Sequence, residues 1–143
     1  MSRLPPTLFF GLMFFYTLGA SGAEQKLVLV TSVQSPIAQL TTIETRKLYL
    51  GAPFQVNGRA ITALRNTSDA RLQEVFMQHV MYMATETYER QILNRVFRTG
   101  GQRPPIYSES HELIQALNSN PFAISYLWHD TALATPGLKI VGE

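Results

Sequence analysis

The chain has 143 residues, carries 12 Lys and Arg against 10 Asp and Glu, and contains no cysteine. This length is typical of a single domain, and a hydrophobic content of 45% against a charged content of 15% excludes a disordered chain. The lack of cysteine excludes disulfides, zinc–thiolate sites and thiol catalysis. A formal net charge of +2 is too small to indicate a nucleic-acid-binding protein.

The first residues have the pattern of an export signal. Arg3 precedes an uninterrupted apolar run at 8–18, and the small residues Ser21 and Ala23 stand where a signal peptidase expects them. The pattern predicts a signal peptide over 1–23, cleaved after Ala23, and a periplasmic protein whose single domain covers 24–143. An uncleaved membrane anchor is the alternative, although the apolar run is shorter than the roughly 20 residues of a spanning helix.

Apolar strands and capped helices alternate along the predicted domain. Residues 26–31 form a continuous apolar run, which is typical of a strand buried on both faces. Thr41 and Glu44 have the spacing of a capping box, which predicts a helix that begins there and ends at Gly51. The other predicted elements are a turn at 56–59, a strand over 60–64, a polar loop at 65–69, helices from Ser68 and from near Thr85, a strand at 106–107, a helix from Ser108, and strands over 122–127 and 138–141.

This alternation predicts an α/β fold with a mostly parallel sheet flanked by helices. In such sheets, ligands bind beyond the carboxyl ends of the strands. The polar loop at 65–69 and Ser108 each follow a predicted strand, so we expect them at the same edge of the sheet.

The polar loop has the chemistry of a small oxyanion site. The Arg65 guanidinium, the Asn66 amide, the hydroxyls of Thr67 and Ser68, and the first amides of the following helix are all suitable donors, with Ser108 added from the neighbouring strand end. The alternative is a helix-capping loop with a solvated arginine, because capping alone accounts for these residue types.

Four segments together resemble the phosphate-type solute-binding proteins of ABC importers. They are Leu40-Thr41 with Glu44 and Leu48-Tyr49-Leu50-Gly51; Asn57-Gly58-Arg59 with the strand to Arg65; Phe97-Arg98-Thr99-Gly100 with Pro104-Pro105; and Asn120-Pro121-Phe122-Ala123-Ile124-Ser125-Tyr126. The resemblance is to the short, single-lobe members of that family. It implies a lobe of the type 2 periplasmic-binding-protein fold. The family's R-S-x-G-S-G-T anion loop falls on residues 65–70, where both glycines are replaced and Asp69 stands near the start of the helix.

Other chemistry has little support in the sequence. The three histidines are isolated, so no metal site is expected, and His79 falls in an apolar helical stripe that predicts a packed side chain. No nucleophile elbow, Walker loop or dinucleotide-binding fingerprint is present, so we expect neither an enzyme nor a cofactor. The densest basic feature, four arginines over 90–103 with aromatic residues between them, fits contact with an anionic ligand, a lipid or a partner, or else a solvated helix.

Two functions follow from these features. The first is a periplasmic solute-binding-type protein with phosphate or a related oxyanion as its ligand, linked to ABC-type import. The alternative is a ligand-free interaction module of the cell envelope, built on the same lobe, whose partner is a membrane transporter or another envelope protein.

Overall fold

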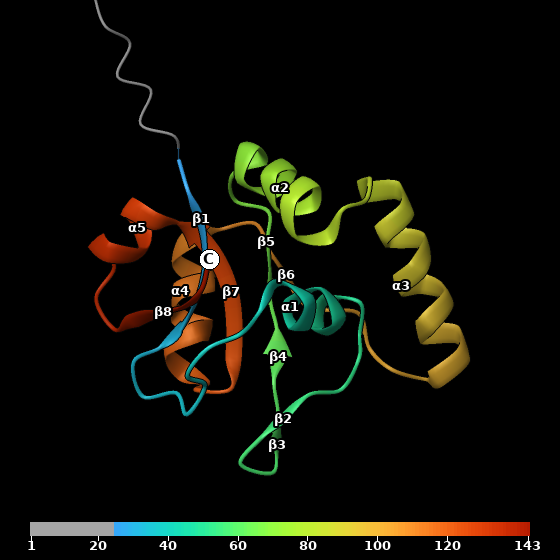
Figure 1. Ribbon diagram of the computed structural model, residues 1–143, viewed down its shortest axis with the longest axis horizontal. Helices are drawn as coiled ribbons and strands as arrows, with labels where there is room; N and C mark the ends of the chain where they lie inside the picture. The colour runs from blue at the N-terminus through green and yellow to red at the C-terminus, as the bar shows by residue number, and fades with distance from the viewer. Residues whose placement is uncertain (1–24) are drawn as a thin grey trace, which may run out of the picture.

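The computed structural model describes residues 25–143, so the predicted signal peptide lies outside the described residues. Within 25–143, no helix is long and apolar enough to cross a membrane. The elements, shown in Figure 1, are β1 (Leu27–Ser32), α1 (Thr42–Tyr49), β2 (Gln55–Val56), β3 (Arg59–Ala60), β4 (Thr62–Ala63), β5 (Arg65–Asn66), α2 (Ala70–Phe76), the π-helix η1 (Met77–Met81), α3 (Thr85–Thr99), β6 (Ile106–Tyr107), α4 (Ser110–Ser119), β7 (Ala123–Trp128), α5 (His129–Ala134) and β8 (Leu138–Gly142).

The central sheet confirms the α/β class and corrects the predicted strand pairing. Its order is β4-β7-β1-β8; only β4 and β7 pair in parallel, and β1 pairs antiparallel with both β7 and β8. Strands β4, β7 and β8 therefore run in one direction, as the alternation of strands and helices predicts. The prediction of a mostly parallel sheet is wrong, since β1 lies between β7 and β8 in the opposite direction and makes both of its pairings antiparallel.

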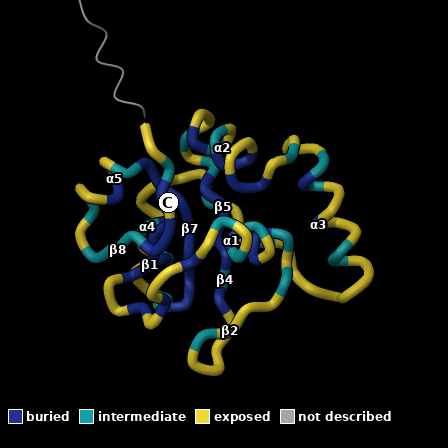
Figure 2. The backbone as a smooth tube through the Cα atoms, viewed as in Figure 1, coloured by how far each residue is buried: buried dark blue, intermediate teal, exposed yellow. Residues whose placement is uncertain are grey.

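The two inner strands of this sheet, β1 and β7, are buried on both faces, as the apolar run predicts for β1. Every residue of β7 is buried, and so is every residue of β1 after Leu27. Alternate side chains pack into two clusters, with Leu29 and Tyr126 on the side of α1, α2 and η1, and Val30 and Leu127 on the side of α4 and α5. In Figure 2, β7 is dark blue at the centre of the molecule, whereas the segment of β2 and β3 is mostly yellow. Because helices cover both faces, the polar residues at the edge of this sheet are the ones that solvent can reach.

Local sequence signals at two places are confirmed. The Thr41 hydroxyl accepts from the Glu44 amide at 3.2 Å, and the Thr41 amide donates to the Glu44 carboxylate at 3.1 Å, which completes the capping box of α1. The turn between β2 and β3 places Asn57 and Gly58 at φ +52° and +77°, in the left-handed region that this dipeptide tolerates.

Several boundaries differ from the predictions. The loop expected at 65–69 begins as β5, which pairs in parallel with β6. Helix α2 has Asp69 rather than Ser68 as its N-cap, and the N-cap of α4 is Glu109 rather than Ser108. His79 is exposed instead of packed, because its turn is a π-helix and its position on the helix is rotated away from the core. Helix α5 is not among the predicted elements.

Candidate functional site

A cleft of about 340 Å³ lies at the ends of β5 and β7, between the first turns of α2 and α4. It brings together three of the predicted site residues, Asn66, Ser68 and Ser108, because β5 and β6 are parallel neighbours whose carboxyl ends meet at one edge. Arg65 and Thr67 do not line it. The full lining is Asn66, Ser68, Asp69, Leu72, Ser108, Glu109, Ser110, Leu127, Trp128 and Thr131.

Asn66 holds the loop that forms one wall of the cleft. Its side chain is fully buried, and its amide nitrogen donates to the Tyr126 carbonyl at 3.0 Å. Its side-chain oxygen accepts from the Ser68 amide at 3.0 Å and from the Ser68 hydroxyl at 2.6 Å. The amide of Asn66 is therefore engaged by the protein itself, and its role is to position Ser68.

Thr67 is tied to β6 rather than to the cleft. Its backbone amide donates to the Tyr107 carbonyl at 2.9 Å, and its hydroxyl lies 3.3 Å from the same oxygen. These contacts fasten β5 to β6 and leave the Thr67 hydroxyl turned toward the protein.

A carboxylate of the protein occupies the start of α2. Asp69 Oδ1 accepts from the Arg71 amide at 2.9 Å and from the Leu72 amide at 3.1 Å, and Oδ2 accepts from Trp128 Nε1 at 2.9 Å. The indole hydrogen bond is the largest cause that holds the pKa of Asp69 below its ordinary value, and the two amides add to it. The helix amides that the sequence predicts as anion donors are therefore occupied by Asp69.

Arg65 is turned toward α3. Its side chain is almost fully buried, its Nη1 lies 2.6 Å from Glu89 Oε1, and its guanidinium sits 4.8 Å from the centre of the Tyr88 ring. Glu89 also pairs with Arg103, and Arg65 Nε has no hydrogen-bond partner. The charge of Arg65 is therefore compensated inside the protein, away from the cleft.

The start of α4 is the more open wall of the cleft. Its N-cap residue, Glu109, makes no side-chain capping hydrogen bond, so the first-turn amides of this ten-residue helix are not capped by a side chain. Hydroxyls of Ser108, Ser110 and Thr131 lie around it. The charged side chains among the lining residues are the carboxylates of Asp69 and Glu109, so the cleft combines hydroxyl and amide donors with negative charge.

Sequence reasoning missed Trp128 as a member of the site. The only available signal is that the single tryptophan of the chain stands at the end of an apolar strand, where side chains of a buried sheet reach its carboxyl edge.

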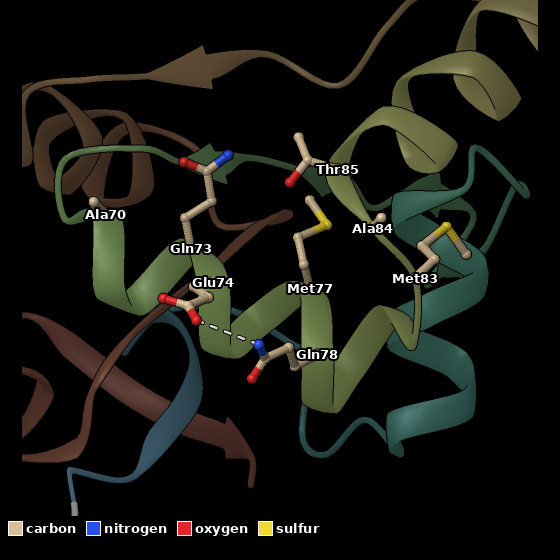
Figure 3. A pocket seen from close by; sticks show the side chains of 8 residues that line it. All are labelled: Ala70, Gln73, Glu74, Met77, Gln78, Met83, Ala84 and Thr85. Carbon is tan, nitrogen blue, oxygen red and sulfur yellow. Dashed lines mark hydrogen bonds between the residues drawn. The ribbon is translucent and has the colours of Figure 1, made fainter.

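A second cavity, of about 310 Å³, lies between α2–η1 and the start of α3 (Figure 3). Glu74 is its ionisable side chain, and the Gln78 amide donates to it at 3.3 Å. No predicted site residue lines this cavity. Its lining is Ala70, Gln73, Glu74, Met77, Gln78, Met83, Ala84 and Thr85.

In the described part of the chain, His, Asp and Glu side chains form no group of three or more that could hold a metal ion.

Solved structures share this fold. An ABC-type phosphate transport receptor from Vibrio cholerae aligns with a TM-score of 0.61 and 12% identity over 82% of this chain and 45% of its own. A putative phosphate ABC transporter substrate-binding protein from Clostridium perfringens, solved with bound phosphate, aligns at 0.62 and 16% identity over 82% and 44%. PstS from Borrelia burgdorferi aligns at 0.60 and 16% identity over 82% and 47%.

The comparison defines a fold class. The chain has the fold of slightly less than half of each phosphate-transport protein that it matches. No family model matches the sequence, and no curated protein matches it either.

Proposed function

We propose that this protein is a single-lobe solute-binding-type protein of the cell envelope that binds a small oxyanion, with phosphate as its ligand, and works with an ABC-type importer. The observation that carries the proposal is the cleft at the strand ends, where Ser68 and Ser108 come together from two parallel strands in a fold shared with phosphate-transport proteins. The proposal assigns no catalytic residue and no cofactor.

The donors of the cleft favour a ligand that carries oxygen atoms. Hydroxyls of Ser108 and Ser110 and the uncapped amides of α4 are suited to donate to phosphate oxygens. The Ser68 hydroxyl donates to Asn66, so toward phosphate it can act only as an acceptor of the phosphate proton. At neutral pH phosphate keeps a proton that it can donate to the carboxylate of Asp69 or Glu109, whereas sulfate has none. The cleft therefore favours phosphate over sulfate. A cleft that one lobe forms leaves much of the ligand exposed, so the binding is expected to be weak.

Calorimetric titration of the purified exported protein with phosphate and with sulfate tests the proposal. We expect saturable heat with phosphate and none with sulfate. Ser108→Ala is expected to weaken phosphate binding by about tenfold to a hundredfold, because a hydrogen bond to a charged group contributes about 1.5–3 kcal/mol. Ser119→Ala, at the other end of α4 and outside the cleft, is the matched control and is expected to bind normally. Absence of heat with phosphate contradicts the oxyanion function.

A second function is favoured by the charges of the site. Asp69 occupies the amides of α2 and Glu89 compensates Arg65, so the two strongest predicted anion-binding features are engaged by the protein. This supports the interaction module, in which the open cleft face contacts a membrane transporter or another envelope protein. A titration without heat for either anion, on a protein that is folded by circular dichroism, favours this second function.

Export is part of the proposal. Signal-peptide cleavage after Ala23 is expected to give an intact mass that corresponds to residues 24–143. A mass that includes Met1 contradicts cleavage and favours the membrane-anchor alternative.

A further inference from the structure

Helix α3 carries an apolar stripe that faces solvent. The helix packs on the protein through Tyr88 and Ile92, and it stands at the edge of the molecule, apart from the central sheet (Figure 1). Residues three and four apart share a face of a helix, so Arg90, Leu93 and Phe97 form one stripe on the side opposite to the packed residues. Phe97 is 81% exposed and Leu93 is 45% exposed.

Positive charge is concentrated around this stripe. Residues 90–108 contain four arginines and no Asp or Glu, although the whole chain has a net charge of only +2. Arg103 pairs with Glu89, and Arg95 lies against Gly51. Arg90 and Arg98 are exposed, and among residues 25–143 no carboxylate lies within 4 Å of either guanidinium. We call Arg90, Leu93, Phe97 and Arg98 the α3 outer face.

We propose that the α3 outer face docks onto the surface of an anionic phospholipid bilayer. A phenylalanine and a leucine one helical turn apart, flanked in the sequence by Arg90 and Arg98, have the composition of a helix that lies in the headgroup region. The apolar pair enters the boundary of the acyl chains, and Arg90 and Arg98 meet lipid phosphates. Charge complementarity carries this choice of occupant, because the two exposed arginines of the face outnumber Glu86, the carboxylate that lies one turn before Arg90 on the same side of α3.

Other occupants fit these observations less well. A second copy of the chain docked face to face brings like charges together, which opposes association. A protein partner must offer a pocket that matches a convex helix, whereas lipid headgroups rearrange around one. A label on α3 that shows no shift on anionic vesicles therefore overturns the proposal and leaves an acidic protein surface as the occupant.

A fluorophore placed on α3 tests the contact directly. Because the chain has no cysteine, Asn94→Cys on α3 and Lys47→Cys on α1 each give one labelling site at an exposed position. With a nitrobenzoxadiazole label, we expect a blue shift at residue 94 on phosphatidylglycerol vesicles and no shift on phosphatidylcholine vesicles. Residue 47 is expected to show no shift on either. This local readout is independent of any membrane affinity of residues 1–23.

Substitutions in the face give the second measurement. Phe97→Ser is expected to lower the affinity for phosphatidylglycerol vesicles by about tenfold or more, as for exposing a large apolar side chain. Arg90→Glu is expected to lower it at least fivefold, and added salt is expected to weaken binding by the wild type. Leu133→Ser, at another exposed apolar position on α5, is the matched control and is expected to have no effect.

Two results overturn the proposal. One is a label at residue 94 that responds equally to both lipids or to neither. The other is a Phe97→Ser variant that is folded and binds vesicles as well as Leu133→Ser does.

Discussion

The contact between Asp69 and Trp128 joins the cleft to the stability of the fold, and substitution of Asp69 measures it. Asp69→Ala removes the N-cap of α2 and also leaves the Trp128 indole nitrogen without its acceptor, in a side chain that is only 8% exposed. Asp69→Asn keeps an oxygen that can cap the helix. We therefore expect Asp69→Ala to lower the free energy of unfolding more than Asp69→Asn.

The structure gives the size of this effect. Loss of an N-cap costs about 1 kcal/mol, and an unsatisfied buried donor costs about 1–3 kcal/mol. The expected loss for Asp69→Ala is therefore about 3 kcal/mol. For Asp69→Asn it is about 1 kcal/mol, because only the charge of the acceptor is lost. Glu74→Gln on the same helix is the control, and it is expected to cost less than about 0.5 kcal/mol because its pair with Arg71 is exposed.

Urea unfolding followed by tryptophan fluorescence is the assay, since Trp128 is the only tryptophan of the chain and reports its own contact. The shift in the urea midpoint, at an unchanged m-value, gives the change in stability. An Asp69→Ala variant that is no less stable than Glu74→Gln contradicts the predicted role of Asp69 as cap and as acceptor for Trp128. So does an Asp69→Ala variant that is no less stable than Asp69→Asn.

The same contact predicts a dependence on pH. The pKa of Asp69 is lower in the folded protein than in the unfolded chain, chiefly because Trp128 donates to its carboxylate. Its contribution to stability is therefore complete at neutral pH, and it is lost as the pH falls below about 4 toward the lowered pKa. The difference in stability between the wild type and Asp69→Asn is expected to shrink over this range. A difference that stays constant down to pH 2 contradicts the assignment.

Two further substitutions test the interior of the protein by urea unfolding. Glu89→Ala is expected to lower the free energy of unfolding by about 3 kcal/mol, because it leaves the buried guanidinium of Arg65 without its ion pair. Glu86→Ala on the same helix is the control and should lower it by less than about 1 kcal/mol. Equal losses for the two variants count against a role for the Arg65 pair. Gly142→Ala is expected to cost about 2 kcal/mol, because a Cβ there would lie 2.9 Å from a backbone carbonyl oxygen. Gly101→Ala serves as its control, because a Cβ there would lie 3.3 Å from the Thr99 hydroxyl and would meet no backbone atom, so equal stability of the two variants contradicts the predicted clash.

Features that depend on neighbouring residues could be predicted from the sequence. The capping box of α1 needs only Thr41 and Glu44, three positions apart. The hairpin turn needs only the left-handed tolerance of Asn57 and Gly58. The strand at 27–32 follows from an apolar run whose length and composition exclude exposure on either face. The interactions behind such features form between residues within one or two turns of chain, so they can be predicted without knowledge of the fold.

The roles of the site residues depend on partners that are distant in the sequence. Asp69 replaces Ser68 as the cap because the Trp128 indole, 59 positions later, stabilises its carboxylate, and Ser68 is instead bound by Asn66. Arg65 leaves the predicted loop because Glu89 on α3 offers a charge. A sequence presents these side chains as equally free donors and acceptors. Only the packed structure decides which are already paired, because each pairing depends on how the strands and helices come together.

The same division holds for the sheet and the cleft. Three features of the sheet could be predicted from sequence patterns: the α/β class, the common direction of β4, β7 and β8, and the position of 65–69 and Ser108 at one edge. The antiparallel position of β1 between β7 and β8 and the negative charge of the cleft could not be predicted in this way, because both depend on how distant segments pack together. The local pattern of apolar and polar residues is enough to show which segments form strands and which of their faces are buried. Which strand pairs with which depends instead on how much apolar surface the complete sheet buries, and this cannot be read from any one segment.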